Sequence, residues 1–260
     1  MPTTLIEYMS LAPAFALALA RMAGLMIAAP IFSSPAIPRM VRVYLVLAMT
    51  AAVFPLVLPG LRCDFTLGGA VAGMLGEFAL GAALGLGANV ILTATQLTGA
   101  IIEQQSGVAI SQLIDPMTGA HASILGQLYF VVAGLVFLAI GGERELVRTL
   151  LESFTRVPVM SFRPDAATCG MLVDLLATSF LLGVRLAAPA IIALLLTSVA
   201  IGFLARTVPQ LNVMSVGFSI KIFVAVIVLL GTLPLASSAL EDAFAGVFES
   251  IRGWLGAARV

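Results

Sequence analysis

Five charged residues lie inside long apolar stretches, where they are the first candidates for chemistry. They are Arg21, Glu77, Asp174, Arg185 and Lys221. An unpaired charge within a bilayer is costly, so each should face a partner, a polar cavity or a subunit interface. Such charges form proton or substrate sites in secondary transporters. Asp174 and Lys221 could instead lie near helix ends and reach water, and the sequence alone assigns no partner to Arg21.

The sequence lacks the patterns of the common catalytic sites. Its only lysine, Lys221, is not part of the Gly-Lys-Ser/Thr loop that binds nucleotide phosphates. Zinc proteolysis needs two histidines one helical turn apart and a serine or cysteine triad needs a histidine base, but the single histidine, His121, lies in a polar segment. An intramembrane aspartyl enzyme using Asp115 and Asp174 stays formally open, although neither residue has a recognisable motif around it. We therefore expect no enzymatic activity and no cofactor or metal site.

A second candidate site is the polar but almost uncharged segment that follows Gln96 and ends at His121. Its polar residues alternate with apolar ones, and Gly107 and Pro116 interrupt any regular helix. Irregular backbone at membrane depth is tolerated only where protein buries it or water reaches it. The segment is therefore either an external loop or a re-entrant segment that lines a cavity.

The composition places these residues in a membrane protein. Of 260 residues, 61% are hydrophobic and 10% are charged, whereas soluble domains have roughly 45–50% apolar and about 25% charged residues. A soluble domain of this size would need far more charge on its surface. The net charge is zero, so no overall field favours a nucleic-acid partner. Lipid or neighbouring subunits must cover the remaining apolar surface.

The apolar residues are grouped in runs that predict six or seven buried helices. The runs cover residues 11–32, 43–58, 65–92, 124–140, 171–203 and 213–235. About 20 apolar residues span a bilayer, so the first and last runs fit one crossing each. The run 171–203 is too long for a single crossing, and we expect Pro189 to break it. Without any long flexible linker, residues 1–260 are predicted to form one membrane-embedded, all-α domain.

Small residues recur at helical spacing in the third run. Gly69 and Gly73 form one pair four residues apart, and Gly81 and Gly85 form another. This spacing allows helix backbones to approach closely in lipid. Although either pair alone could arise by chance among 24 glycines, two pairs in one segment favour tight helix packing.

Several stretches resemble one known family, in the same order and over nearly the whole chain. The first is Arg21-x-x-Gly24 with residues 29–32 and 37–38, and the second is residues 99–107 leading to Asp115-Pro116. The third is residues 137–143 with Ser153-Phe154 and Pro158. The fourth runs from Ala205-Arg206 through Pro209-Gln210-Leu211-Asn212-Val213 to Gly217 and Lys221. Together they resemble the FliR/SctT family of type III secretion export-gate subunits. The segment from Arg206 to Val213 is the most specific part, and the flagellar branch is preferred over the injectisome branch.

This resemblance implies a multi-pass subunit of the bacterial inner membrane within the flagellar basal body. The family's members are built of tilted helical hairpins and join a helical, pseudo-symmetric assembly. The implied partners are the gate subunits FliP and FliQ, the export proteins FlhB and FlhA, unfolded flagellar export substrates and the lipid bilayer, with no nucleic acid. The alternative, a small-solute or proton-coupled secondary transporter, would require two related halves with corresponding broken helices, which the sequence does not show.

The resemblance also implies roles for two sets of residues. The pore plug would comprise Gln105, Gly107, Ile110, Gln112, Leu113, Ile114, Asp115 and Pro116. Its isoleucines and leucine can exclude water and ions from a pore, while its glutamines keep it soluble when displaced. Subunit-interface or intramembrane charge roles would fall to Arg21, Glu77, Arg185, Arg206, Gln210, Asn212 and Lys221.

Overall fold

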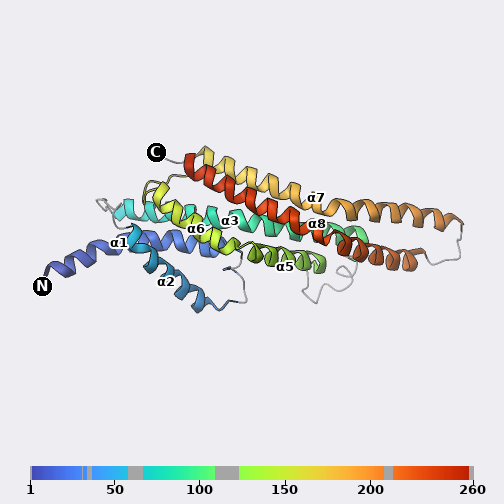
Figure 1. The fold of residues 1–260 in the computed structure, drawn as a ribbon, viewed down its shortest axis with the longest axis horizontal. Helices are drawn as coiled ribbons and strands as arrows, with labels where there is room; N and C mark the ends of the chain where they lie inside the picture. The colour runs from blue at the N-terminus through green and yellow to red at the C-terminus, as the bar shows by residue number, and fades with distance from the viewer. Residues whose placement is uncertain are drawn as a thin grey trace. The chain divides into compact units, whose positions relative to one another are not determined.

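The computed structural model describes residues 2–30, 32–33, 37–57, 67–108, 123–207 and 213–257, and its regular secondary structure there is wholly helical (Figure 1). The helices are α1 (Pro2–Ala28), α2 (Arg39–Val57), α3 (Leu67–Ser106), α5 (Ile124–Ala139), α6 (Gly142–Arg156), α7 (Ala166–Thr207) and α8 (Val213–Ala257). The predicted all-α fold class is thereby confirmed.

Three of these helices are long and apolar enough to cross a membrane. The helices α3, α7 and α8 contain 40, 42 and 45 residues, about twice the length that a bilayer requires. Among the described residues, α5 and α6 could together form a fourth, broken span, and the apolar stretch Ala12–Ala28 of α1 is shorter than a span. The chain is therefore an all-α membrane protein.

The prediction that Pro189 breaks its apolar run is wrong. Helix α7 continues through Pro189 from Ala166 to Thr207, and α1, α2 and α8 likewise contain Pro13, Pro55 and Pro234. Proline removes one backbone hydrogen bond, but in apolar helices neighbouring groups and small local adjustments can satisfy the freed carbonyl. The excess length of the run thus belongs to one long helix.

The helices form two compact units. The first unit contains Met1–Val90, Gly141–Leu176 and Phe244–Val260, and the second contains Ile91–Ile140 and Ala177–Ala243. Each of the long helices α3, α7 and α8 contributes one part to each unit.

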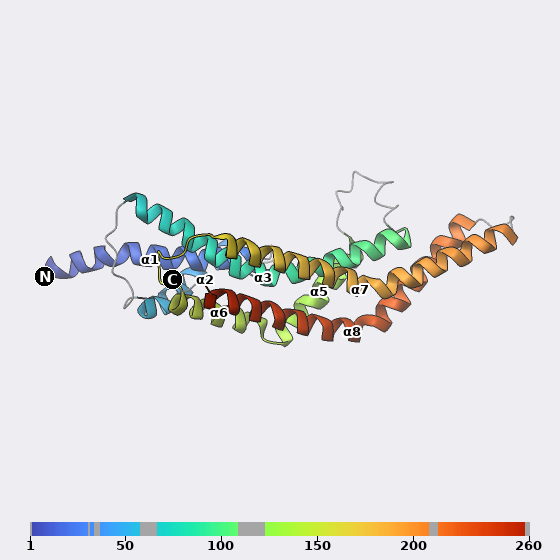
Figure 2. The same cartoon turned by 90° about the horizontal axis from the view of Figure 1, so that it is seen from above.

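Glycines bring the backbones of α1 and α3 into contact within the first unit. A Cβ on Gly81 would overlap the carbonyl oxygen of Arg21, and a Cβ on Gly24 would overlap the carbonyl oxygen of Phe78. A Cβ on Gly85 would also meet the backbone of α1, and Figures 1 and 2 both show α1 running beside α3. The close packing predicted from the spacing of Gly81 and Gly85 is confirmed.

Replacing Gly81 with alanine is expected to destabilise the folded chain by about 1–3 kcal/mol, the usual range for overpacking a tight core. The reason is that the overlapping atom belongs to the backbone of α1 and cannot rotate away. Gly170→Ala is the matched control, because no atom lies within 4 Å of its added Cβ. Thermal unfolding in detergent should show a lower midpoint for Gly81→Ala only, and equal midpoints would contradict the contact.

The second unit has a core of alanines, branched aliphatic side chains and one tyrosine from four helices. Its buried members are Ile102 of α3, Tyr129 of α5, Ala187, Ala190 and Leu194 of α7, and Ala225 and Leu229 of α8. The hydroxyl of Thr98 in α3 donates to the carbonyl oxygen of Gly183 in α7 at 3.0 Å. A Cβ on Gly183 would lie 2.9 Å from the carbonyl oxygen of Ala94, so α3 and α7 also touch through their backbones.

Helix α6 is amphipathic, and the face that it buries within the first unit combines two leucines with small residues. Its buried residues are Gly142, Leu146, Thr149, Leu150 and Ser153. Glu143 and Glu145 lie in its first turn and Arg156 in its last, which complements the helix dipole. Glu145 also forms an ion pair with Arg252 of α8. This arrangement fixes the rotation of α6 and directs Ser153 inward.

Candidate functional site

Arg21 and Glu77 form a buried ion pair in the first unit. Arg21 lies in α1 and Glu77 in α3, and Nε of Arg21 is 2.5 Å from Oε2 of Glu77. Both side chains are completely buried. The sequence singles out both residues as intramembrane charges, and the structure identifies Glu77 as the partner that the sequence leaves unassigned for Arg21.

The other two nitrogens of the Arg21 guanidinium are also engaged. Its Nη1 donates to Oγ of Ser153 and its Nη2 to the carbonyl oxygen of Val157, each at 3.1 Å. The guanidinium carbon lies 4.3 Å from the centre of the Phe154 ring, a distance at which a cation is attracted to an aromatic face. Arg21 therefore connects α1 to α6 and to the chain that follows α6.

The second oxygen of Glu77 fixes the connection between α6 and α7. Its Oε1 accepts a hydrogen bond from the backbone N–H of Met160 at 2.8 Å. Met160 has a φ of 69°, a conformation that non-glycine residues rarely adopt and that surrounding contacts must hold. The side chain of Met160 lies over Gly73 of α3, where an added Cβ would come within 3.1 Å of it.

The Arg21 cluster, comprising Arg21, Glu77, Ser153, Phe154, Val157 and Met160, is a structural cross-link. Both oxygens of Glu77 and all three nitrogens of the Arg21 guanidinium have partners within the chain. Buried charges with all of their hydrogen bonds satisfied hold a unique geometry. The engagement of all three guanidinium nitrogens and both carboxylate oxygens disfavours the substrate site that the transporter alternative assigned to Arg21.

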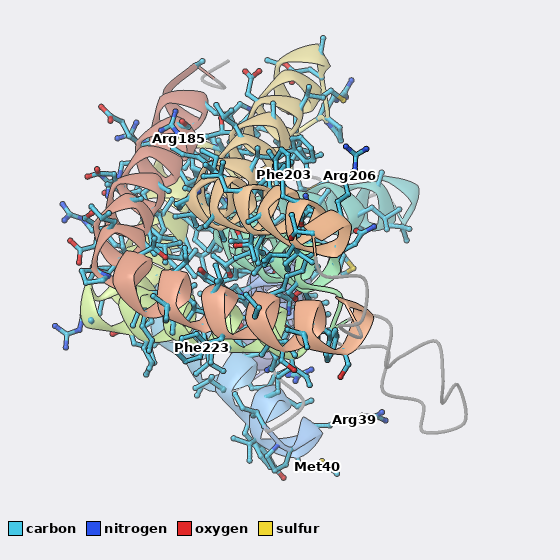
Figure 3. The ribbon with its side chains drawn as sticks, turned by 90° about the vertical axis from the view of Figure 1, so that its right-hand side faces the viewer. Arg39, Met40, Arg185, Phe203, Arg206 and Phe223 are labelled. Atoms are coloured by element: carbon cyan, nitrogen blue, oxygen red, sulfur yellow. The ribbon has the colours of Figure 1, made fainter. Side chains whose placement is uncertain are left out.

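The other predicted charges are not part of this cluster. Arg185 and Asp174 are exposed on α7, and Lys221 is half-buried on α8. Arg206 is exposed in the last turn of α7, and Figure 3 shows its side chain pointing away from the helix. Gln210 and Asn212 lie outside the described residues, so their interface roles remain predictions.

The predicted plug is described only at its beginning. Gln105 is exposed in the last turn of α3, and Gly107 follows the helix with a φ of 85°. Six of the predicted plug residues lie outside the described residues: Ile110, Gln112, Leu113, Ile114, Asp115 and Pro116. Their role therefore stays a prediction.

Apolar side chains cover the exposed faces of α7 and α8 in the second unit. On α7 they are Phe180, Leu181, Ile192, Leu195, Leu196, Val199, Phe203 and Leu204, and on α8 they are Val216, Phe218, Ile220, Phe223, Val226, Ile227, Leu230 and Leu235. Figure 3 labels Phe203 on α7 and Phe223 on α8. In the most apolar windows of α7 and α8, only 22% and 17% of the residues are buried. Lipid or other subunits must cover the rest.

Comparison with known proteins agrees with these features. The family described as bacterial export proteins, family 1, matches residues 12–247. The chain belongs to this family. The FliR/SctT relationship predicted from the sequence is confirmed.

Individual relatives of this export protein family align over most of the chain. The flagellar biosynthetic protein FliR of Bacillus subtilis is 28% identical over 248 residues, covering 94% of this chain and 95% of the relative. FliR of Escherichia coli is 28% identical and covers 89% and 88% of the two chains. The surface presentation of antigens protein SpaR of Shigella sonnei is 33% identical over half of each chain. The chain is thus a membrane-embedded component of a type III export apparatus.

Sequence reasoning about this export family member missed the uncharged half of the Arg21 cluster. Ser153 and Phe154 appear in the sequence only as family markers, and nothing there joins them to Arg21. Val157 and Met160 contribute backbone groups, which no pattern of side chains can reveal. The available signal was the presence of one cation in the first apolar run and one anion in the third, because charges in such runs require partners.

Proposed function

We propose that this chain is a non-enzymatic subunit of the flagellar type III protein export gate. With FliP and FliQ it forms the channel through which unfolded flagellar proteins cross the inner membrane. The observation that carries the proposal is the apolar surface left uncovered on α7 and α8 of an export family member. Lipid alone could cover this surface of a single chain. A channel, however, requires several subunits that enclose a common path, and the apolar faces can serve as contacts between them.

The cations of α7 and α8 outside the Arg21 cluster are suited to the polar edges of such subunit contacts. Arg206 ends α7 next to the predicted interface residues Gln210 and Asn212, and Arg185 and Lys221 lie on the parts of α7 and α8 that belong to the second unit. Arginine is common at protein interfaces because its planar group binds acceptors in a fixed geometry. FlhB and FlhA, at the basal body, are the further partners in this proposal.

The polar segment serves as the plug of this channel. In this proposal Ile110, Leu113 and Ile114 supply the apolar side chains that exclude water and ions, while Gln105 and Gln112 keep the segment soluble when an export substrate displaces it. Because the sequence contains no nucleotide-binding loop, other parts of the machine supply the energy for displacement.

Residues 1–260 act as a single membrane-embedded domain in this proposal. Support comes from α3, α7 and α8, each of which runs without a break through residues of both compact units. A boundary between independent domains would fall in an exposed linker with few crossing contacts. Here the chain passes between the units inside α3, α7 and α8, and otherwise only at the short connection between α5 and α6.

Removal of the chain from its own cells tests the proposed function. Those cells should retain flagellar proteins in the cytoplasm and should not swim, and the intact chain supplied from a plasmid should restore both activities. The culture medium is probed for secreted filament protein, and growth on defined solutes is measured in parallel. Normal secretion combined with loss of uptake of one solute would contradict the gate and support a transporter.

A further inference from the structure

A cavity of about 220 Å³ lies between α1 and α2 in the first unit. The buried side chains of Met26 and Val46 line it, together with the exposed side chains of Ile27, Val43 and Leu47. Because buried and exposed apolar side chains share the lining, the cavity is a groove that opens at the surface of the helix pair. We call it the α1–α2 groove.

The start of α2 places positive charge beside the α1–α2 groove. Arg42 lines the groove, and Arg39 lies one helical turn earlier on the same face of α2. An arginine in such a place packs its aliphatic stem against apolar neighbours and holds its guanidinium at the polar edge. Helix α2 contains no acidic residue, and Figure 3 shows the side chains of Arg39 and Met40 extending outward from its first turn. One end of the groove is therefore cationic.

The lining of the groove suits a hydrocarbon chain better than a peptide. An apolar cavity of about 150 Å³ holds a benzene molecule, so this larger groove accommodates a segment of one acyl chain. A peptide would bring backbone N–H and C=O groups into a space where apolar side chains offer them no partner, which is unfavourable. Phe15 and Phe54 join the same two helices farther from Arg42, with 5.4 Å between their ring centres. A chain would therefore enter at the arginine end.

The residues around Arg42 are of the kinds that meet lipid headgroups. Tyr44 is 68% exposed, and tyrosine is enriched at the membrane–water interface. Guanidinium groups bind phosphate through two parallel hydrogen bonds, and basic pockets between membrane helices bind anionic lipid headgroups. A molecule that joins a phosphate to hydrocarbon chains matches both parts of the groove.

We propose that the α1–α2 groove binds one anionic phospholipid. Part of an acyl chain lies against Met26 and Val46, and the phosphate binds Arg42 and Arg39. The bound lipid covers apolar side chains of both helices and attaches the start of α2 to the headgroup layer of the membrane. This site goes beyond the proposed export function and does not depend on it.

Photoreactive lipids test the site in the intact protein. The chain is purified from its own membranes with its associated subunits and reconstituted into liposomes of phosphatidylcholine. Phosphatidylglycerol and phosphatidylcholine with the same acyl chains, each carrying a light-activated diazirine in one chain, are added to separate samples, and mass spectrometry identifies the cross-linked peptides. We expect residues 19–27 and 42–47 to be labelled about tenfold more by phosphatidylglycerol, because two arginines near one anionic headgroup each strengthen binding severalfold.

Two kinds of variant separate the headgroup contact from the acyl-chain contact. Arg39→Gln combined with Arg42→Gln should reduce labelling by phosphatidylglycerol to the level of phosphatidylcholine. Arg144→Gln, which removes an exposed cation of α6, is the matched control and should change nothing. Ala23→Phe places a ring in the groove and should reduce labelling by both lipids. Val43→Trp, at the exposed rim, makes the same test if Ala23→Phe does not assemble.

Three results would overturn the proposal. Equal labelling of the groove by the two lipids would show only general contact with the bilayer. A loss of selectivity in Arg144→Gln as large as in the double arginine variant would show that no particular cation binds the headgroup. Absence of labelling in the intact complex would mean that another subunit, and not a lipid, covers the groove.

Discussion

Replacing Arg21 with alanine should destabilise the folded chain more than any other single substitution considered. The substitution removes every contact of the guanidinium and leaves the carboxylate of Glu77 buried beside an empty space. Breaking a buried ion pair by removing one partner destabilises a protein by about 3–5 kcal/mol, a large part of the 5–15 kcal/mol that is typical of a whole domain. The steady-state level in membranes and the midpoint of thermal unfolding in detergent measure the loss.

Two further variants show whether the effect comes from the stranded charge. Arg144 is the matched control, because it pairs with Glu143 at the surface at 3.6 Å and its side chain is 89% exposed; Arg144→Ala should change stability by less than about 1 kcal/mol. The double variant Arg21→Met with Glu77→Leu removes both charges together and should be more stable than Arg21→Ala. A double variant as unstable as the single one would contradict this explanation.

Deleting residues 105–118 is expected to make the assembled complex permeable to ions while its subunits still associate. The deleted residues carry the apolar side chains proposed to exclude water from the pore. Apart from Gln105 and Ser106, which end α3, they lie outside the described helices. Conductance should rise from background to the level of an open channel. Liposomes containing the purified complex, loaded with an ion-sensitive dye, provide the measurement.

Substitutions that keep the segment at full length identify the side chains responsible. Changing Ile110, Leu113 and Ile114 together to serine should produce a leak, because water can hydrate a polar constriction. Changing Gln105 and Gln112 to alanine should not, since these residues contribute solubility rather than a seal. A deletion complex that stays impermeable to ions would contradict the plug. A leak from the glutamine variant alone would mean that the glutamines, and not the apolar side chains, form the seal.

The helical fold follows from features that are local in the sequence. The apolar runs contain helices because backbone groups in lipid must be satisfied within their own segment, and the runs predict α3, α7 and α8. The pair Gly81 and Gly85 predicts a close helix contact because only a missing side chain allows such approach. Pro189 misled the prediction, since a rule that holds for helices in water is relaxed in apolar surroundings.

The connections between distant residues could not be predicted from the sequence. Arg21 and Glu77 are 56 residues apart, and several other charges could have satisfied either one. Glu103 reads as one polar residue among several at the end of an apolar run, although it accepts the N–H of Ile124 21 residues later. Which residues on different helices become hydrogen-bond or ion-pair partners depends on where and at what angle the helices pack. A single sequence gives the composition of each helix but not this packing geometry.

Purification from native membranes in a mild detergent tests the central claim most directly. The chain leaves the apolar faces of α7 and α8 uncovered, so we expect it to elute in one large complex that contains FliP and FliQ, as identified by mass spectrometry. Recovery of the chain as a stable single subunit, free of both proteins, would contradict its role as part of a shared channel.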